Sequence, residues 1–197
     1  RLGKNIRSEN FVRGAKLISQ KELKDWSLRK WKSYHREFPG AKDKNAPRYS
    51  VGGVPFPPNA VEAQTAFFDK GHWVESVVST ALHAVNQTTW QARLSSSENI
   101  QFGVYGQGEF YNEHRDIDLA TPINRKLSIT VQLTDPNYYK GGDFVLWSLE
   151  GKELRKDEWR NKGSVLVFPS FLKHKVEKVT KGTRMSLVQW YAGPEWN

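Results

Sequence analysis

The sequence contains no cysteine, which excludes a disulfide framework and thiolate metal ligands. It also lacks a run of eighteen apolar residues, so no membrane-spanning helix is expected. No secretory signal pattern opens the chain, whose first residues, RLGKNIRSEN, are polar and basic. Since the absence of disulfides fits a reducing compartment, we expect a cytoplasmic protein that makes no membrane contact.

The net charge of +9 is concentrated at one end of the chain. Residues 1–50 hold 14 Lys and Arg against 5 Asp and Glu, whereas residues 51–197 hold 16 of each kind. A basic segment attracts acidic partners, nucleic acid included, over a Debye length of about 8–10 Å. A solvated arm with a charged helix face explains the same pattern. We therefore do not favour nucleic-acid binding through residues 1–50, although it stays an alternative.

Two helices and a long connection are expected in the first half of the chain. Residues 19–22, SQKE, match a capping box, which predicts a helix from Gln20 to about Tyr34. Segment 41–60 contains several Pro and Gly residues and is interpreted as a long loop that could edge a substrate site. A second helix is predicted over residues 73–88, because one side of it would carry Val74, Val77, Val78, Leu82 and Val85. His83 lies beside that apolar side and is interpreted as structural.

From about residue 91 the pattern changes to short strands separated by turns, which indicates a β-sandwich or barrel. The expected strands are IQFGVYG, GEFYNEH, LSITVQL, GDFVLWS, SVLVFPS, KHKVEKV and TRMSLVQWY. Alternation in LSITVQL predicts an apolar side and a polar or water-exposed side formed by Ser128, Thr130 and Gln132. We predict one mainly β domain over residues 1–197. Its jelly-roll barrel would span 91–197, supported by a basic arm, helices and the long loop in 1–90.

Three residues form a candidate metal site. His114 and Asp116 stand two positions apart in FYNEHRDIDL, and His174 lies 58 residues beyond Asp116. Side chains two positions apart in an extended segment point to the same side, so the first two can take adjacent coordination positions. Two imidazoles and one carboxylate are the ligand set of a mononuclear non-haem Fe(II) site with open positions for a co-substrate and O₂.

Arg184 is the fourth candidate, ten positions after His174 in the alternating segment TRMSLVQWY. If that segment is a strand, Arg184, Ser186, Val188 and Trp190 share one face. An arginine that points into a barrel needs an anionic partner, because burying an unpaired guanidinium is costly. We expect that partner to be a carboxylate on a small molecule.

From about Ile100 to the C-terminus, the sequence resembles the catalytic core of Fe(II)/2-oxoglutarate-dependent dioxygenases, specifically the prolyl 4-hydroxylase-like group. The matching segments are VYGQGEFYNEHRD, LSITVQLTDPNYYKGGDF, GSVLVFPSFLKHKV and TRMSLVQWY. The resemblance implies a double-stranded β-helix and, as cofactors, Fe(II), 2-oxoglutarate and O₂, with ascorbate as an additional candidate. It implies that His114, Asp116 and His174 hold the metal, and that 2-oxoglutarate contacts Arg184, Tyr105, Ser186 and Gln132.

The same resemblance implies hydroxylation of a protein or peptide side chain, coupled to decarboxylation of 2-oxoglutarate to succinate and CO₂. Proline is the expected target and lysine the next, since Arg184 stands where many prolyl 4-hydroxylases of this group have lysine. Trp190 occupies the position at which related nucleic-acid demethylases carry a second arginine, which counts against base repair. An oxygenase of a free amino acid or other small molecule stays an alternative. A non-enzymatic cupin-like or nucleic-acid-binding module is the less favoured one.

Overall fold

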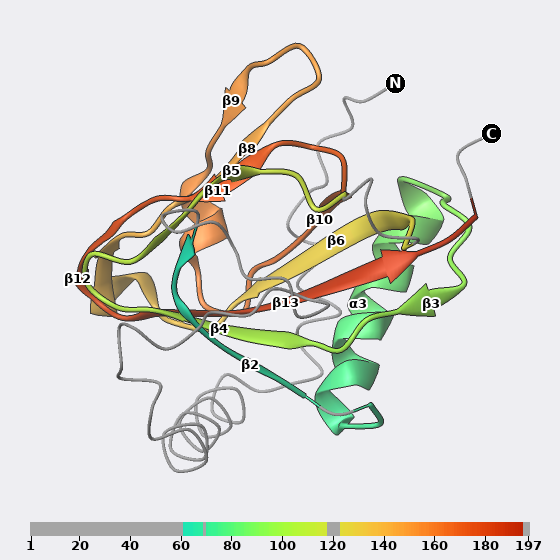
Figure 1. Ribbon diagram of the computed structural model, residues 1–197, viewed down its shortest axis with the longest axis horizontal. Coiled ribbons are helices and arrows are strands. Elements are labelled where there is room, and N and C mark those ends of the chain that lie inside the picture. Colours follow the sequence, from blue (N-terminus) through green and yellow to red (C-terminus); the bar gives the residue numbers. More distant parts are fainter. Residues whose placement is uncertain (1–60, 69, 118–122, 195–197) are drawn as a thin grey trace.

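The computed structural model describes residues 61–68, 70–117 and 123–194, and this part of the chain consists mainly of antiparallel strands (Figure 1). One sheet has the order β1 (Val61–Glu62), β5 (Phe110–His114), β11 (His174–Val176), β8 (Phe144–Trp147), β9 (Glu153–Leu154). The second has the order β10 (Val165–Pro169), β6 (Arg125–Gln132), β13 (Arg184–Ala192), β4 (Gln101–Tyr105), β2 (Gln64–Phe67), and β3 (Ser96–Ser97) pairs with β13. A small sheet pairs β12 (Val179–Gly182) with β7 (Tyr139–Gly141). The remaining elements are α3 (Trp73–Thr88) and the 3₁₀ turns η2 (Pro136–Tyr138) and η3 (Asp157–Arg160).

All seven strands expected from the sequence are present, which confirms the mainly β fold class. Six further strands in the described residues were not predicted: β1 and β2, which lie before the helix and pair with β5 and β4, and β3, β7, β9 and β12 after it. They are only two to four residues long, which is too short for a clear alternation in the sequence. The expected helix from Gln20 to about Tyr34 and the loop at 41–60 lie outside the described residues, so the single domain over 1–197 stays a prediction.

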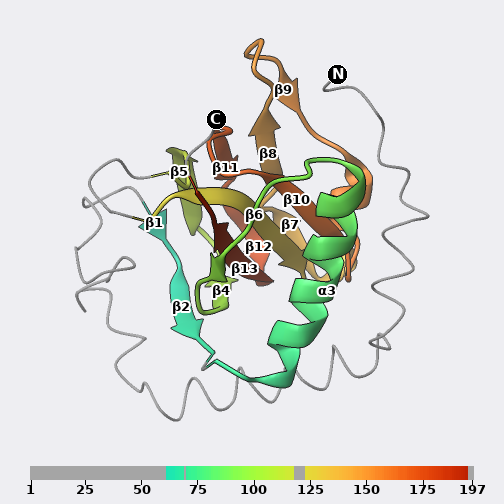
Figure 2. The same ribbon diagram turned by 90° about the vertical axis from the view of Figure 1, so that its right-hand side faces the viewer.

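Helix α3 spans the residues predicted for it and covers the outer face of the second sheet (Figures 1 and 2). The His72 side chain caps it by accepting a hydrogen bond from the backbone of Val74. The hydrophobic core between helix and sheet is formed by buried residues that include Val74, Val78, Leu82 and Val85 of the helix with Phe102, Val104, Leu127, Ile129 and Leu187 of the strands. No helix in the described part of the chain has the length and apolarity needed to cross a membrane.

Strand β6 is buried on both faces, unlike the half-exposed wall suggested by its alternation. Leu127 and Ile129 pack toward α3. Ser128, Thr130 and Gln132 point the other way and are also buried, so this side is polar, as one of the two expected alternatives has it, and is not exposed to water. Ser128 contacts Asp116, which follows β5 of the opposite sheet. The polar face of β6 therefore lines a protein interior, where hydroxyls and amides need hydrogen-bond partners.

Strand register brings the candidate residues together across long stretches of sequence. His114 of β5 lies opposite His174 of β11. Arg184 lies opposite Tyr105 of β4. Central strand β13 also places Ser186 opposite Gln132 of β6. The fold thus builds two polar clusters, one at the ends of β5 and β11 and one along β4, β13 and β6.

Candidate active site

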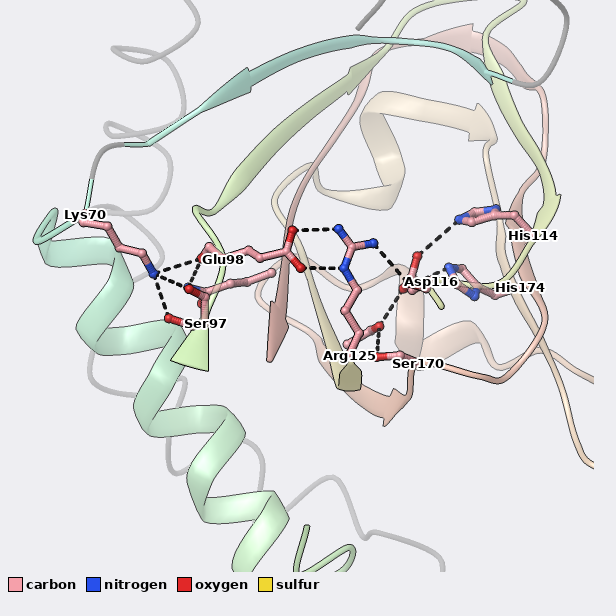
Figure 3. Close-up of polar contacts among 10 residues, drawn as sticks. Lys70, Ser97, Glu98, His114, Asp116, Arg125, Ser170 and His174 are labelled. Atoms are coloured by element: carbon pink, nitrogen blue, oxygen red, sulfur yellow. Dashed lines mark hydrogen bonds and ion pairs between the residues drawn. The ribbon is translucent and has the colours of Figure 1, made fainter. Parts of the chain in front are cut away.

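The first cluster contains two imidazoles and one carboxylate. His114 Nε2 lies 3.6 Å from Asp116 Oδ1, and His174 Nε2 lies 3.5 Å from Asp116 Oδ2. One ligand atom from each of the three residues lies within 4.8 Å of the others. Figure 3 shows the two imidazoles on the same side of Asp116. This spacing suits a shared cation with nitrogen and oxygen ligands.

Both imidazoles are oriented by main-chain carbonyls. His174 Nδ1 lies 2.9 Å from the carbonyl oxygen of Leu172, and His114 Nδ1 lies 2.7 Å from that of Asn112. A carbonyl only accepts, so each Nδ1 carries the proton and each neutral ring leaves Nε2 free to coordinate. Backbone contacts of this kind fix the tautomer and orientation of metal-binding histidines.

Aromatic rings shield the two imidazoles. The Tyr111 ring stacks on His114 with centroids 3.6 Å apart and planes 13° apart. The rings of Phe144 and Phe168 lie 5.6 and 4.9 Å from the ring of His174. His174 is buried, whereas His114 keeps partial exposure. The cluster is therefore enclosed on the His174 side and reaches solvent at His114.

Burial and charge oppose each other at the carboxylate. Burial by itself raises the pKa of Asp116, but the charges and hydrogen bonds of His174 and His114 hold that pKa well below its usual range. Burial by itself lowers the pKa of His174. The charge and hydrogen bond of Asp116 have the larger combined effect, so the pKa of His174 is raised overall. No Lys or Arg among the described residues forms an ion pair with the Asp116 carboxylate. A divalent metal needs the carboxylate ionised and the imidazoles neutral, so its binding would displace the proton that Asp116 favours on His174.

The second cluster is a buried cation without an acidic partner. Arg184 is 3 % exposed, and its Nη1 donates to Ser186 Oγ at 3.1 Å. The guanidinium carbon lies 5.4 Å from the centre of the Tyr105 ring. Burial lowers the pKa of Arg184 and raises that of Tyr105 to about 12. In the described part of the chain, no Asp or Glu is ion-paired with Arg184, so this cluster has the charge to bind an anion.

Gln132 and Tyr139 complete this cluster. Gln132 Nε2 donates to the carbonyl oxygen of Thr134 at 3.0 Å and to Tyr139 Oη at 3.1 Å. Tyr139 is buried and was missed by the sequence analysis. Gly142 leaves room here, because a Cβ at this position would lie 3.1 Å from Arg184 Cδ. The Gly-Gly pair next to Tyr139 was the available sequence signal for a close approach.

The structure places all seven predicted site residues in these two clusters, and their roles stay predictions. Three residues around Asp116 were not predicted as part of the site, namely Arg125, Ser128 and Ser170. Ser128 Oγ donates to Asp116 Oδ2 at 2.6 Å, and Arg125 Nη1 donates to the Asp116 carbonyl at 3.0 Å. The polar face of LSITVQL was a signal for Ser128. No comparable signal marked Ser170, which lies in a turn.

A model of the 2OG-Fe(II) oxygenase superfamily matches residues 100–192. A PKHD-type hydroxylase of Gloeothece citriformis is 37 % identical over 55 % of this chain and 48 % of its own length. Another, from Rippkaea orientalis, is 30 % identical over 58 % of this chain and 45 % of its own. A third, from Idiomarina loihiensis, is 33 % identical over 44 % of this chain and 38 % of its own. The aligned part of the chain thus spans about half or less of these curated relatives.

Solved structures with low sequence identity support the jelly-roll fold. A Pseudomonas putida prolyl-4-hydroxylase is similar with a TM-score of 0.64 and 18 % identity, over 90 % of this chain and 89 % of that one. A Trichoplax adhaerens prolyl hydroxylase, solved in complex with a hypoxia inducible factor oxygen degradation domain peptide fragment, is similar with a TM-score of 0.62 and 16 % identity. That match covers 97 % of this chain and 80 % of the other.

Proposed function

Because residues 100–192 match the model of the 2OG-Fe(II) oxygenase superfamily, we propose that the chain is a 2-oxoglutarate-dependent hydroxylase acting on a protein or peptide side chain, with proline as the target. The observation that carries this proposal is the presence of two complementary clusters in one interior. One presents a buried carboxylate to two imidazoles, and the other holds a buried arginine without an acidic partner among the described residues. A metal ion would satisfy the first cluster, and one carboxylate of a dicarboxylate would satisfy the second.

The donor set fits Fe(II). His114 and His174 would each bind it through Nε2, and Asp116 would supply the carboxylate, which leaves positions for 2-oxoglutarate and O₂. When bound, iron with O₂ and 2-oxoglutarate supplies the oxidising chemistry that hydroxylates a C–H bond and releases succinate and CO₂. The rings of Phe168, which is buried, and Phe144, which is partly buried, would keep water away from the His174 side of this centre.

Arg184 would orient 2-oxoglutarate through its distal carboxylate. A guanidinium can hold a carboxylate through two parallel hydrogen bonds, and such charge-assisted bonds are about twice as strong as neutral ones. Ser186 would add a hydroxyl, because it already accepts from Arg184 and can donate its own proton to the ligand. Tyr105 would form one wall and, with its pKa raised to about 12, stay neutral and able to donate. Gln132 would contact the ligand from β6.

The prolyl substrate is supported by the names of the relatives rather than by a contact in this chain. The sequence relatives are PKHD-type hydroxylases, and both similar solved structures are prolyl hydroxylases, one of them with a peptide. Arg184 in place of the lysine common in this group makes lysyl side chains the second choice. Ascorbate is proposed as an accessory reductant, which turnover measured with and without ascorbate would test.

The deciding experiment is an anaerobic titration of the full chain with Fe(II) and then 2-oxoglutarate, followed in the visible charge-transfer region. A band that saturates at one equivalent supports the metal and chelation assignments. His83→Ala provides the matched control, since His83 lies on α3 and contacts Tyr191 instead of the site. Folded protein that gives no band would refute the oxygenase assignment.

Aerobic incubation with proline- and lysine-containing peptides then tests the substrate class. Peptide mass gain of one oxygen, matched by succinate formation, supports a peptide hydroxylase. Succinate formation that responds to free amino acids and never to peptides would refute the peptide assignment while leaving the oxygenase chemistry in place.

A further inference from the structure

Asp116 is anchored at its backbone and at its side chain. Its N–H donates to the carbonyl of Ser170 at 2.9 Å, and its own carbonyl accepts from Arg125 Nη1 at 3.0 Å. Its Oδ2 accepts from Ser128 Oγ at 2.6 Å. Oδ1 has no hydroxyl donor among the described residues and faces His114 Nε2 at 3.6 Å. Oδ2 is therefore held by a hydroxyl and also lies 3.5 Å from His174 Nε2, whereas Oδ1 is left facing His114.

The contact between Ser128 and Ser170 has a defined direction. The two hydroxyl oxygens lie 2.9 Å apart, and both residues are fully buried. Asp116 Oδ2 is the acceptor in its hydrogen bond with Ser128 Oγ. Ser128 has one hydroxyl proton, which it gives to Asp116. Ser170 must therefore donate to Ser128, and the chain runs from Ser170 through Ser128 to Asp116.

This row of hydrogen bonds also joins the segments that carry Asp116 and His174, the two most buried residues of the first cluster. Ser170 directly follows β10 and precedes His174 by four residues. Its N–H donates to the carbonyl of Lys126 on β6 at 3.0 Å. The same turn contains Leu172, whose carbonyl orients His174. Asp116 and His174, far apart in sequence, are thus held against a common strand.

Arg125 fixes the backbone at Asp116 by contacts that do not involve the serines. Glu98 accepts from Arg125 Nε at 2.5 Å and from Nη2 at 2.7 Å. The guanidinium also lies 4.3 Å from the centre of the Trp190 ring. Figure 3 shows Arg125 between Glu98 and Asp116. Loss of a serine hydroxyl should therefore release the carboxylate of Asp116 without displacing its main chain.

We propose that Ser128 and Ser170 are positioning residues that act in series, Ser170 orienting Ser128 and Ser128 holding Asp116 Oδ2 so that Oδ1 is presented to the metal. This inference rests on the proposed function, since it concerns the metal that function requires. Consecutive hydrogen bonds polarise one another, so a bond donated by Ser170 makes Ser128 a better donor to Asp116. Partners of metal ligands typically change metal affinity by about 10–100-fold when they are removed.

The test measures the Kd for Fe(II) in anaerobic titrations of the full chain, with Co(II) absorption as a second spectroscopic readout. Ser128→Ala should weaken binding by about 10–100-fold and alter the Co(II) spectrum. Ser128→Thr keeps a hydroxyl and should restore affinity to near wild type. Thr130→Val is the matched control, because Thr130 is buried on the same face of β6 two positions further on. It should leave the Kd unchanged.

A double-mutant cycle tests the serial arrangement. Ser170→Ala should cause a smaller loss of affinity alone, and no further loss when combined with Ser128→Ala. If Ser170→Ala lowers the Fe(II) affinity equally in the wild type and in Ser128→Ala, the two serines do not act in series. If folded Ser128→Ala binds Fe(II) like the wild type, Ser128 does not position Asp116. A wild-type chain that binds no Fe(II) would instead overturn the proposed function, so the two failures are distinct. Thermal unfolding of each metal-free variant checks that the loss is local.

Discussion

Replacing Arg184 with methionine should separate stability from ligand binding in this protein. Arg184 is 3 % exposed and has no acidic partner among the described residues, so within this part of the chain its buried charge is uncompensated when no ligand is bound. Exchanging buried charged groups for apolar residues of similar volume is often neutral or stabilising, by about 1–4 kcal/mol. Because Arg184 keeps its hydrogen bond to Ser186, we expect the lower part of that range, about 1–2 kcal/mol of added stability. In a chain of this size that corresponds to a rise in Tm of about 2–8 °C.

The same change should nearly abolish binding of 2-oxoglutarate. Each hydrogen bond to a charged group contributes about 1.5–3 kcal/mol. Loss of a two-bond contact therefore weakens the affinity by about 10²–10⁴-fold. Affinity for Fe(II) should change much less, because Arg184 lies in the other cluster and not among the three candidate ligands.

Two measurements check this prediction: thermal unfolding of the metal-free protein, and anaerobic calorimetric titration of 2-oxoglutarate into the Fe(II)-loaded protein. Arg155→Met is the control. Arg155 is exposed and paired with Glu153 and Glu177, so its loss should change stability by less than about 1 kcal/mol and leave ligand affinity unchanged. An Arg184→Met variant that is strongly destabilised yet binds 2-oxoglutarate like the wild type would show that Arg184 is structural.

Two further predictions concern His174 and Tyr105. His174→Ala should abolish Fe(II) binding and turnover while far-UV circular dichroism stays unchanged, because the side chain is held by packing and one backbone contact; global unfolding would contradict a role confined to the metal. Burial raises the pKa of Tyr105 from 10.0 to about 12, so its contribution to the free energy of unfolding is fully present below pH 10 and is lost as the pH rises toward 12. Urea unfolding should then show wild type losing about 2–3 kcal/mol more than Tyr105→Phe between pH 9 and pH 12, and parallel losses would refute this assignment.

The sequence by itself determined the fold class, the family and the set of candidate residues. Strand alternation was sufficient for the seven core strands, and apolar periodicity located α3 at its observed bounds. The match of residues 100–192 to the 2OG-Fe(II) oxygenase model confirms the resemblance expected from the spaced motifs. These features are local in sequence, or are short patterns in fixed order, so they are visible before folding.

Only the tertiary structure decided which further residues contact the candidate site residues Asp116 and Arg184. Ser128, Ser170, Arg125 and Tyr139 carry no motif of their own, and their importance comes from strand register and from a turn that bring them to Asp116 and Arg184. It likewise decided that the polar face of β6 is buried, since alternation assigns a side chain to a face and only the facing sheet determines whether that face meets water. Periodicity reports geometry along one strand, whereas burial and hydrogen bonding depend on the neighbours that the fold supplies.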